Sequence, residues 1–470
     1  MNLPDATNDT IAAVSTPPGR GGIGIVRLSG PLAASIAAQL VRLHQPLEHG
    51  RARLADVLDE DAGSDASRID EAVVTYFAAP NSYTAEDLVE IAAHGSPVVL
   101  ELLLNRAVTL GARLARPGEF TERAFFAGKL DLTQAEAVRD LIEAQTLTQA
   151  RQAASQMGGA LSRRVSPVKQ ALVELVALLE AGIDFAEDDV ELTTQAEIAS
   201  RIDALTPPLQ ALEASFARGH VVHDGLTLAI VGRPNVGKSS LFNCLVERER
   251  AIVTATPGTT RDTVSERISL DGIPLELVDT AGLREGQNEG MGDGLEEAEQ
   301  LGIHRSREAL ADAALVVIVL DASQPLNDEE RRLLAAVEGR SALVAVNKCD
   351  LIRNLPEVER PLPDCGDLPV LATSALTGEG IPALRERILE LATGGAAAEP
   401  GMLTSLRQKQ AIAAAMAALA DAAQANAASI PHEMILLDLY RVLWALDSLT
   451  GQTTPDDILN LIFSTFCIGK

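Results

Sequence analysis

The feature that most constrains the fold is the octapeptide GRPNVGKS (232–239), which directly follows the apolar run TLAIV. It matches the pattern G-x-x-x-x-G-K-[ST] between a strand and a helix. The glycines let backbone N–H groups turn toward phosphate oxygens, and the helix presents its positive N-terminus. Lys238 can neutralise the β- and γ-phosphates, and the Ser239 hydroxyl can bind Mg²⁺. The segment therefore predicts a nucleotide site within an α/β domain.

Around this motif, near-continuous apolar runs alternate with helical stretches. The runs lie at 227–232, 275–280, 315–321, 342–347 and 369–374. Such strands predict a parallel, doubly wound sheet. Helical segments precede and follow this region, and Thr133 with Glu136 fits a capping box in the first of them. We therefore expect an α/β domain inserted into a discontinuous helical domain.

Two further segments indicate which nucleotide binds. DTAG (279–282) closes a strand, so that Asp279 can reach Mg²⁺ through water and Gly282 can follow the γ-phosphate. NKCD (347–350) follows another strand, and Asp350 there can accept hydrogen bonds from guanine N1–H and its amino group. These segments resemble the nucleotide-binding set of translation-factor-class GTPases and predict GTP. The predicted GTP-binding residues are Asn235, Val236, Gly237, Lys238, Ser239, Ser240, Thr254, Ala255, Thr256, Pro257, Gly258, Thr259, Thr260, Asp279, Thr280, Ala281, Gly282, Asn347, Lys348, Asp350, Ser374 and Ala375.

The segment TATPGTTRD (254–262) supplies hydroxyl and carbonyl oxygens between the phosphate loop and DTAG. Thr260 is the natural second hydroxyl ligand for Mg²⁺. Ras-like enzymes place a water-orienting glutamine directly after the DxxG motif. Leu283 stands at that position and cannot orient water, so hydrolysis is predicted to use another group.

The chain of 470 residues carries 39 Lys+Arg against 66 Asp+Glu, a formal charge of −27. This acidity disfavours binding of nucleic acid by bulk electrostatics, so any RNA contact is expected to use a local patch or a partner. The four cysteines have neither disulfide nor zinc spacing. With a polar N-terminus and no apolar run of about 18 residues, these features predict a cytoplasmic protein without a membrane span.

A second glycine pattern, formed by Gly19, Gly21 and Gly24, satisfies GxGxxG. The residues that follow it, IVRLSG, have the pattern of a strand and not of a helix, so a dinucleotide site is disfavoured. A tight β-hairpin is the better interpretation. Residues 50–70 have the composition of an exposed, acidic connection.

Several longer stretches resemble one family, the bacterial and organellar tRNA-modification GTPase family MnmE, also called TrmE. They are DTIAAVSTPPGRGGIGIVRLSG (9–30), PNSYTAEDLVEIAAHG (80–95), ARPGEFTERAFFAGKLDLTQAEAV (115–138), GRPNVGKSS, TTRD, DTAGLRE and the terminal FCIGK (466–470). The resemblance spans the whole chain.

The family implies an α+β tetrahydrofolate-binding and dimerisation domain (1–127), a helical domain in two parts (128–224 and 396–470) and an inserted GTPase domain (225–395). It implies a homodimer that forms a heterotetramer with the FAD-dependent partner MnmG. Together they install an aminomethyl or carboxymethylaminomethyl group at C5 of the wobble uridine of certain tRNAs. The one-carbon unit comes from 5,10-methylene-tetrahydrofolate, and 5-formyl-tetrahydrofolate is an alternative bound form.

The resemblance also carries residue roles. Arg27, Glu90, Lys129 and Lys470 match folate contacts, and Cys467 matches a cysteine implicated in the modification chemistry. A K⁺ site matches Asn235, Thr254, Thr256 and Thr259. Glu299 matches the catalytic glutamate, although the Gly-rich stretch 286–294 is longer than the family usually has, which leaves Glu296 and Glu297 as rivals.

A second function is compatible with the GTPase motifs, namely an RNA-binding ribosome-assembly GTPase that acts as a switch. Such proteins carry a basic RNA-binding appendage. The first 127 residues contain no lysine and more acidic than basic side chains, and the sequence ends without a basic tail. Composition therefore favours the tRNA-modifying function.

Overall fold

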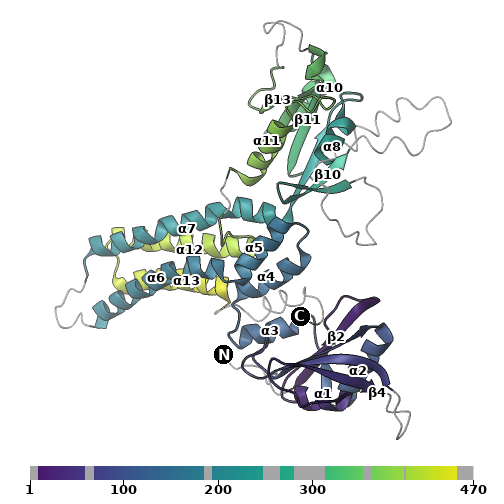
Figure 1. Cartoon of the computed structure of the whole chain (residues 1–470). Helices are drawn as coiled ribbons and strands as arrows, with labels where there is room; N and C mark the ends of the chain where they lie inside the picture. The colour runs from purple at the N-terminus through teal and green to yellow at the C-terminus, as the bar shows by residue number, and fades with distance from the viewer. Residues whose placement is uncertain are drawn as a thin grey trace, which may run out of the picture. The chain divides into compact units, whose positions relative to one another are not determined.

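The computed structural model describes residues 9–58, 68–184, 193–246, 265–279, 313–352, 363–395, 399–451 and 469. The chain divides into two compact units, residues 1–139 together with 447–470, and residues 140–446 (Figure 1). None of the helices in these ranges combines the length and the apolar character that crossing a bilayer requires.

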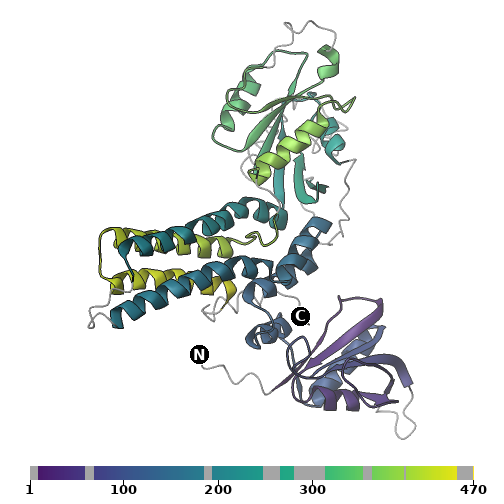
Figure 2. The same cartoon turned by 60° about the vertical axis from the view of Figure 1, so that its left-hand side comes forward.

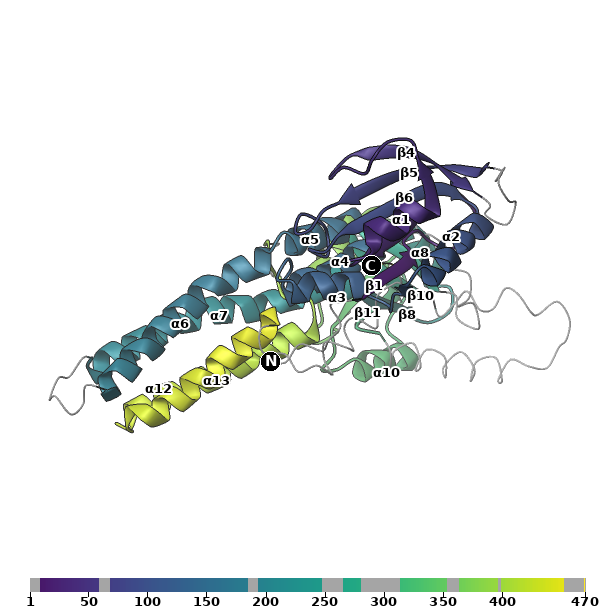
Figure 3. The same ribbon diagram turned by 90° about the horizontal axis from the view of Figure 1, so that it is seen from below.

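The first unit is built on a seven-stranded mixed sheet in the order β3-β4-β5-β6-β2-β1-β7. The strands are β1 (Thr10–Val14), β2 (Gly21–Ser29), β3 (Val41–Leu43), β4 (Ala52–Leu58), β5 (Arg68–Phe77), β6 (Leu88–Gly95) and β7 (Ala112–Leu114). Helices α1 (Ala33–Leu40) and α2 (Pro97–Thr109) cover one face of the sheet (Figure 3). Their apolar side chains and those of the strands form one buried core.

Two interpretations of this region have different outcomes. The GxGxxG glycines lie in the antiparallel β1–β2 hairpin, as predicted, but the tight turn is wrong, because pairing with β1 ends at Val14 and Val26 and leaves a long loop between them. A Cβ at Gly24 would come within 2.4 Å of the Leu100 side chain on α2. The exposed connection predicted for 50–70 is wrong, because β4 and the start of β5 lie in it. Ala55 and Val57 are fully buried, and Asp56 pairs with Arg68 at 3.3 Å, so the acidic composition concealed a paired strand.

Helices α3 (Glu119–Phe126) and α4 (Leu132–Glu143) follow the sheet. The capping box at the start of α4 is formed by Asp131 and Gln134. The Asp131 carboxylate accepts from the Gln134 N–H at 2.9 Å, and the Gln134 side chain accepts from the Asp131 N–H at 2.9 Å. Thr133, which was predicted to be the cap, instead donates its hydroxyl to Asp131. The cap therefore lies two residues earlier, because aspartate is also an effective N-cap.

The second unit contains a bundle of helices from two distant parts of the sequence. They are α5 (Leu147–Met157), α6 (Ala160–Asp184), α7 (Gln195–Asp224), α12 (Leu406–Ala427) and α13 (His432–Thr450). Figures 1 and 2 show α12 and α13 lying alongside α7 and α6. The Asn426 amide donates to the Gln195 carbonyl at 3.0 Å, which joins α12 to α7. Helices from both sides of the inserted segment thus pack together, as the predicted fold class requires.

The inserted segment forms a six-stranded sheet in the order β13-β12-β11-β8-β10-β9. The strands are β8 (Leu226–Val231), β9 (Ser265–Leu270), β10 (Ile273–Asp279), β11 (Leu315–Asp321), β12 (Ala342–Asn347) and β13 (Val370–Ala372). Helices α8 (Lys238–Val246), α10 (Asp328–Ala336) and α11 (Ile381–Thr393) connect them. The sheet is parallel except for the edge strand β9, which the sequence did not predict. Asp271 (φ 49°) and Gly272 (φ 82°) form the tight turn that makes β9 antiparallel to β10.

Candidate functional site

The phosphate-loop motif occupies the connection from β8 to α8. Gly232 (φ 155°) and Gly237 (φ 98°) adopt backbone conformations that side chains disfavour. A Cβ on Gly237 would lie 2.2 Å from Nδ2 of Asn347, so the loop approaches the end of β12 too closely for any other residue. The two glycines therefore shape a concave backbone in front of the first turn of α8, which is the geometry that phosphate binding requires.

Lys238 is the first residue of α8, and its side chain folds back over the loop. Its Nζ donates to the carbonyl oxygens of Gly232 and Arg233, each at 2.8 Å, and the residue is 8% exposed. The ammonium is thus placed over the loop, where a nucleotide phosphate would exchange for these carbonyls. Ser239 follows it in the first helical turn, which is where a hydroxyl ligand for Mg²⁺ is expected.

Asn347 joins the phosphate loop to the predicted base-binding segment. It ends the buried strand β12 and is 2% exposed. Its Nδ2 donates to the Val236 carbonyl at 2.9 Å, and its Oδ1 accepts from the Ala375 N–H at 2.9 Å. One amide therefore sets the position of both segments, and it does so because parallel strands end at the same edge of the sheet.

The NKCD carboxylate is also held in place. Asp350 lies in the short helix η5 (Cys349–Ile352), and its Oδ1 accepts from the Ser374 hydroxyl at 2.5 Å. The predicted residues Ser374 and Ala375 thus contact Asp350 and Asn347, respectively. A carboxylate fixed in this way can accept two N–H groups from a guanine edge.

Asp321, at the end of β11, is a functional residue that the sequence reasoning missed. Lys348 adopts φ 64° and donates its Nζ to Asp321 Oδ2 at 2.7 Å and to the Asn235 carbonyl at 2.7 Å. Burial would raise the pKa of Asp321, but hydrogen bonds from Lys348 and Ser323 outweigh it and lower the pKa. The signal in the sequence is an aspartate that closes the fully buried strand LVVIVLD.

Several predicted site residues lie outside the described residues. Asp279 ends β10, but its side chain is among those not described. The others are Thr254, Ala255, Thr256, Pro257, Gly258, Thr259, Thr260, Thr280, Ala281, Gly282, Glu299, its rivals Glu296 and Glu297, Cys467 and Lys470.

A second polar cluster lies in the first unit, where β2 and β6 run side by side. Arg27 and Glu90 are directly opposite each other in the sheet, and Arg27 donates from Nε at 3.0 Å and from Nη2 at 2.7 Å to Glu90 Oε1. The guanidinium carbon lies 5.5 Å from the centre of the Phe120 ring and 6.0 Å from that of Tyr83. The structure thus brings two of the predicted folate positions into one contact, next to two aromatic rings that sequence reasoning missed.

The segment 80–87 connects the third predicted position to this cluster. Lys129 donates its Nζ to the Pro80 carbonyl at 3.1 Å, and Tyr83 shares a 2.9 Å hydrogen bond with Thr121. Burial raises the pKa of the Tyr83 hydroxyl, while Thr121 and Arg27 oppose that effect. Both Arg27 and Lys129 therefore contact the same segment, but from different elements.

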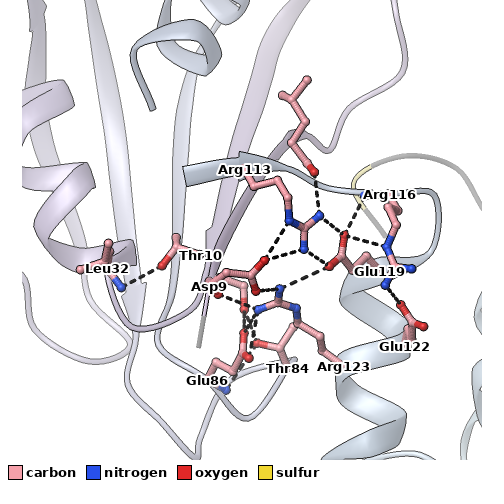
Figure 4. A network of polar contacts seen from close by, with 12 residues as sticks. Asp9, Thr10, Leu32, Thr84, Glu86, Arg113, Arg116, Glu119, Glu122 and Arg123 are labelled. Carbon is pink, nitrogen blue, oxygen red and sulfur yellow. Dashed lines mark hydrogen bonds and ion pairs between the residues drawn. The ribbon is translucent and has the colours of Figure 1, made fainter. Parts of the chain in front are cut away.

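A network of charged side chains holds this segment against α3 and the end of β7 (Figure 4). Arg123 pairs with Glu86 at 3.0 Å and with Asp9 at 2.6 Å, while Arg113 pairs with Glu119 at 2.6 Å. Burial would raise the pKa of Glu119, but hydrogen bonds from Arg113 and the Arg116 N–H, with the charges of Arg113 and Arg123, lower it to about 2. The network therefore stays ionised at neutral pH and fixes the support of the Arg27 cluster.

Comparison with known proteins gives full-length matches. The sequence profile of the MnmE helical domain matches residues 132–467, and that of the GTP-binding protein TrmE N-terminus matches residues 10–129. The tRNA modification GTPase MnmE of Koribacter versatilis is 55% identical, with 100% of both chains covered. That of Chloroflexus aurantiacus is 42% identical over 98% of this chain and 100% of its own.

Among solved structures, the G domain of the T. maritima FeoB iron transporter is 30% identical and covers 36% of this chain and 98% of its own, with a TM-score of 0.26. The whole-chain identity and the two profiles, which together cover nearly all of the sequence, decide the family. The chain belongs to the MnmE family of tRNA modification GTPases.

Proposed function

We propose that this chain is a K⁺-activated GTPase that acts with the FAD-dependent protein MnmG on the wobble uridine of certain tRNAs. Together they add an aminomethyl or carboxymethylaminomethyl group at C5, with the one-carbon unit taken from a folate. One observation carries this proposal. The carbonyl of Gly469, a residue of the CIGK motif, accepts from Arg27 Nη1 at 3.0 Å, so that Gly469 lies against the Arg27–Glu90 pair.

In the proposed GTP site, Asp350 reads the guanine edge and Lys238 contacts the β- and γ-phosphates. Ser239 and Thr260 bind Mg²⁺ through their hydroxyls. Glu299 orients the attacking water. The shape of the phosphate loop supports these roles. Glycine at position 237 lets the loop pack against Asn347, where a Cβ would clash, and so keeps the phosphate loop next to the base-binding segment.

The proposed K⁺ site uses Asn235, Thr254, Thr256 and Thr259. A cation beside the phosphates supplies the positive charge that an arginine finger places in other GTPases. Asn235 supports this assignment, since its φ of 64° and the hydrogen bond from Lys348 to its carbonyl fix its backbone within the phosphate loop.

The Arg27 cluster has a chemistry that suits a folate. A folate offers an aminopyrimidine ring, an aromatic face and carboxylates, and when bound it supplies the one-carbon unit. The Glu90 carboxylate, 26% exposed, can accept from ring N–H groups, and the rings of Tyr83 and Phe120 lie alongside. Lys129 and Lys470 supply positive charge for carboxylates.

For the whole chain we propose the division 1–127, 128–224, 225–395 and 396–470. The first segment binds folate and forms a homodimer, the second and fourth form the helical domain, and the third is the GTPase domain. The homodimer and two MnmG chains form a heterotetramer. Because the substrate of this complex is tRNA, the proposed place of action is the cytoplasm.

The function is tested by mass spectrometry of wobble uridines from cells that lack this protein. Loss of the modification, restored by the wild-type chain, is the expected result. Cys467→Ser should not restore it although its GTP hydrolysis is normal, whereas the matched control Cys365→Ser should restore it. In the cells that lack this protein, ribosome profiles should be the same as in wild-type cells. Accumulation of ribosomal precursors, with normal wobble uridines, would instead establish the ribosome-assembly function.

A further inference from the structure

The carbonyl of Gly469 accepts hydrogen bonds from two side chains that lie far away in sequence. Ser15 Oγ donates at 3.0 Å and Arg27 Nη1 at 3.0 Å, across separations of 454 and 442 positions. Ser15 directly follows β1 and extends its ladder, since its N–H donates to the Ile25 carbonyl at 2.8 Å. Two donors, one directly after β1 and one on β2, therefore converge on one carbonyl near the end of the sequence.

The Arg27 guanidinium is oriented for this contact by its other partners. Nε and Nη2 both donate to Glu90 Oε1, and the ring of Phe120, which is fully buried, lies against the guanidinium. Nη1 is then directed at Gly469. A lysine has a single ammonium group and lacks the planar fork needed to hold both partners in this geometry.

Gly469 is itself fitted to this position. It is buried, and its φ of 95° is one that a side chain disfavours. A Cβ at this residue would lie 2.6 Å from the Val14 carbonyl oxygen and 2.8 Å from Ser15 Cα, both of which are backbone atoms that cannot easily move. Backbone conformation and space therefore both require glycine here.

We infer that Ser15, directly after β1, and Arg27, on β2, are positioning residues that anchor the C-terminal tail through Gly469. The anchor itself stands on geometry, and only its consequence rests on the proposed function. Cys467 is two residues from Gly469, so chain connectivity keeps their Cα atoms within about 7 Å of each other. The proposed consequence of holding Gly469 is that the thiol of Cys467 is kept available to the site around the Arg27–Glu90 pair.

The anchor is measured directly by the rate at which carboxypeptidase B releases Lys470 from the full-length protein. Mass spectrometry of the intact protein follows this release. Ser15→Ala removes one donor and should raise the release rate roughly fivefold, and Arg27→Lys should raise it by about tenfold or more, since a hydrogen bond from a charged donor is lost. Ser35→Ala is the matched control, because the Ser35 hydroxyl donates to the exposed Leu32 carbonyl and should leave the rate unchanged.

For Gly469→Ala, the rate of Lys470 release is divided by the rate for the same variant unfolded in urea, which corrects for the altered sequence at the cleavage site. The corrected rate should rise as much as that of Arg27→Lys. Gly22→Ala, at a glycine of the β1–β2 hairpin where a Cβ meets no atom within 4 Å, should behave as wild type. The inferred anchor would be overturned if the wild-type chain released Lys470 at the same rate when folded as when unfolded. It would also be overturned if Ser15→Ala and Arg27→Lys released Lys470 no faster than Ser35→Ala.

The positioning role is read from tRNA modification by the complex with MnmG. In Ser15→Ala the kcat of modification should fall severalfold, with the KM for tRNA and the rate of GTP hydrolysis unchanged. Normal modification by variants whose tail is released would overturn the positioning role. A wild-type chain that protects Lys470 and yet modifies no tRNA would contradict the proposed function while supporting the anchor.

Discussion

At the scale of single residues, Asp350 is held by the Ser374 hydroxyl with its carboxylate in place for a guanine edge. Asp350→Asn should weaken GTP binding by about 30- to 100-fold, because charge-assisted hydrogen bonds to two ring donors are lost. It should also favour xanthosine triphosphate, whose O2 accepts from the new amide. Titration calorimetry with both nucleotides measures this, with the exposed Asp328→Asn as the control. Unchanged GTP affinity would remove Asp350 from base recognition.

His223, in the last turn of α7, carries a pH dependence of its own. Hydrogen bonds to Asp140, at 3.0 Å from Nε2, and to Asp224 raise its pKa to about 10, against the opposing effect of burial. A raised pKa stabilises the fold fully below the unfolded value of about 6.5, and this contribution is lost as the pH rises to about 10.

His223→Gln should therefore lower the unfolding temperature most near and below pH 6.5, and the difference from wild type should shrink as the pH rises and vanish above about pH 10. Fluorescence of Trp444, the single tryptophan, follows unfolding of the bundle across this range. A difference between the two proteins that stays constant with pH would contradict the assignment of the stabilisation to the imidazolium.

At the scale of elements, the β9–β10 turn contacts the start of α5. The Thr146 hydroxyl, which caps α5, donates to the Gly272 carbonyl at 2.6 Å, and a Cβ at Gly272 would lie 1.9 Å from Thr148 Oγ1. Gly272→Ala should lower the unfolding temperature more than Gly339→Ala does. Gly339 has a similar φ of 76° but open space around its Cβ position, so the pair separates the contact from the backbone strain of about 1–2 kcal/mol. Equal effects in calorimetry would show that the contact contributes nothing.

At the scale of the whole molecule, the proposed K⁺ site predicts how GTP hydrolysis depends on assembly. K⁺ should order the loop 254–259 and promote pairing of two GTPase domains, and Glu299 then orients the water as the loop closes. GTP turnover should be fast in K⁺ and slow in Na⁺, with a difference of up to the roughly 10³- to 10⁵-fold that an arginine finger contributes. Glu299→Ala should abolish turnover with nucleotide affinity retained. Equal rates in K⁺ and Na⁺ would eliminate the potassium mechanism, and an active Glu299→Ala protein would move the role to Glu296 or Glu297.

The local features of this protein are the ones that its sequence determined. The phosphate loop needs glycines at set positions before a helix, and strands buried on both faces need continuous apolar runs such as LVVIVLD, so motif and period identified the nucleotide domain. The antiparallel β1–β2 pairing follows from an equally local glycine-rich turn signal. The family resemblance, confirmed over the full length, added functional roles that no local rule predicts.

Long-range pairing was decided only by the tertiary structure. The sequence of β4 is too polar to identify as a strand until its neighbours β3 and β5 bury Ala55 and Val57. Asp321 gains its role from Lys348, and Arg27 gains a contact with Gly469, because strand order brings together residues that the chain separates. The hydrophobic pattern that predicts a strand or a helix depends only on residues a few positions apart. The contacts of Asp321 and Arg27 depend instead on which strands pack together in the folded sheets. A linear sequence therefore specifies them only through the fold.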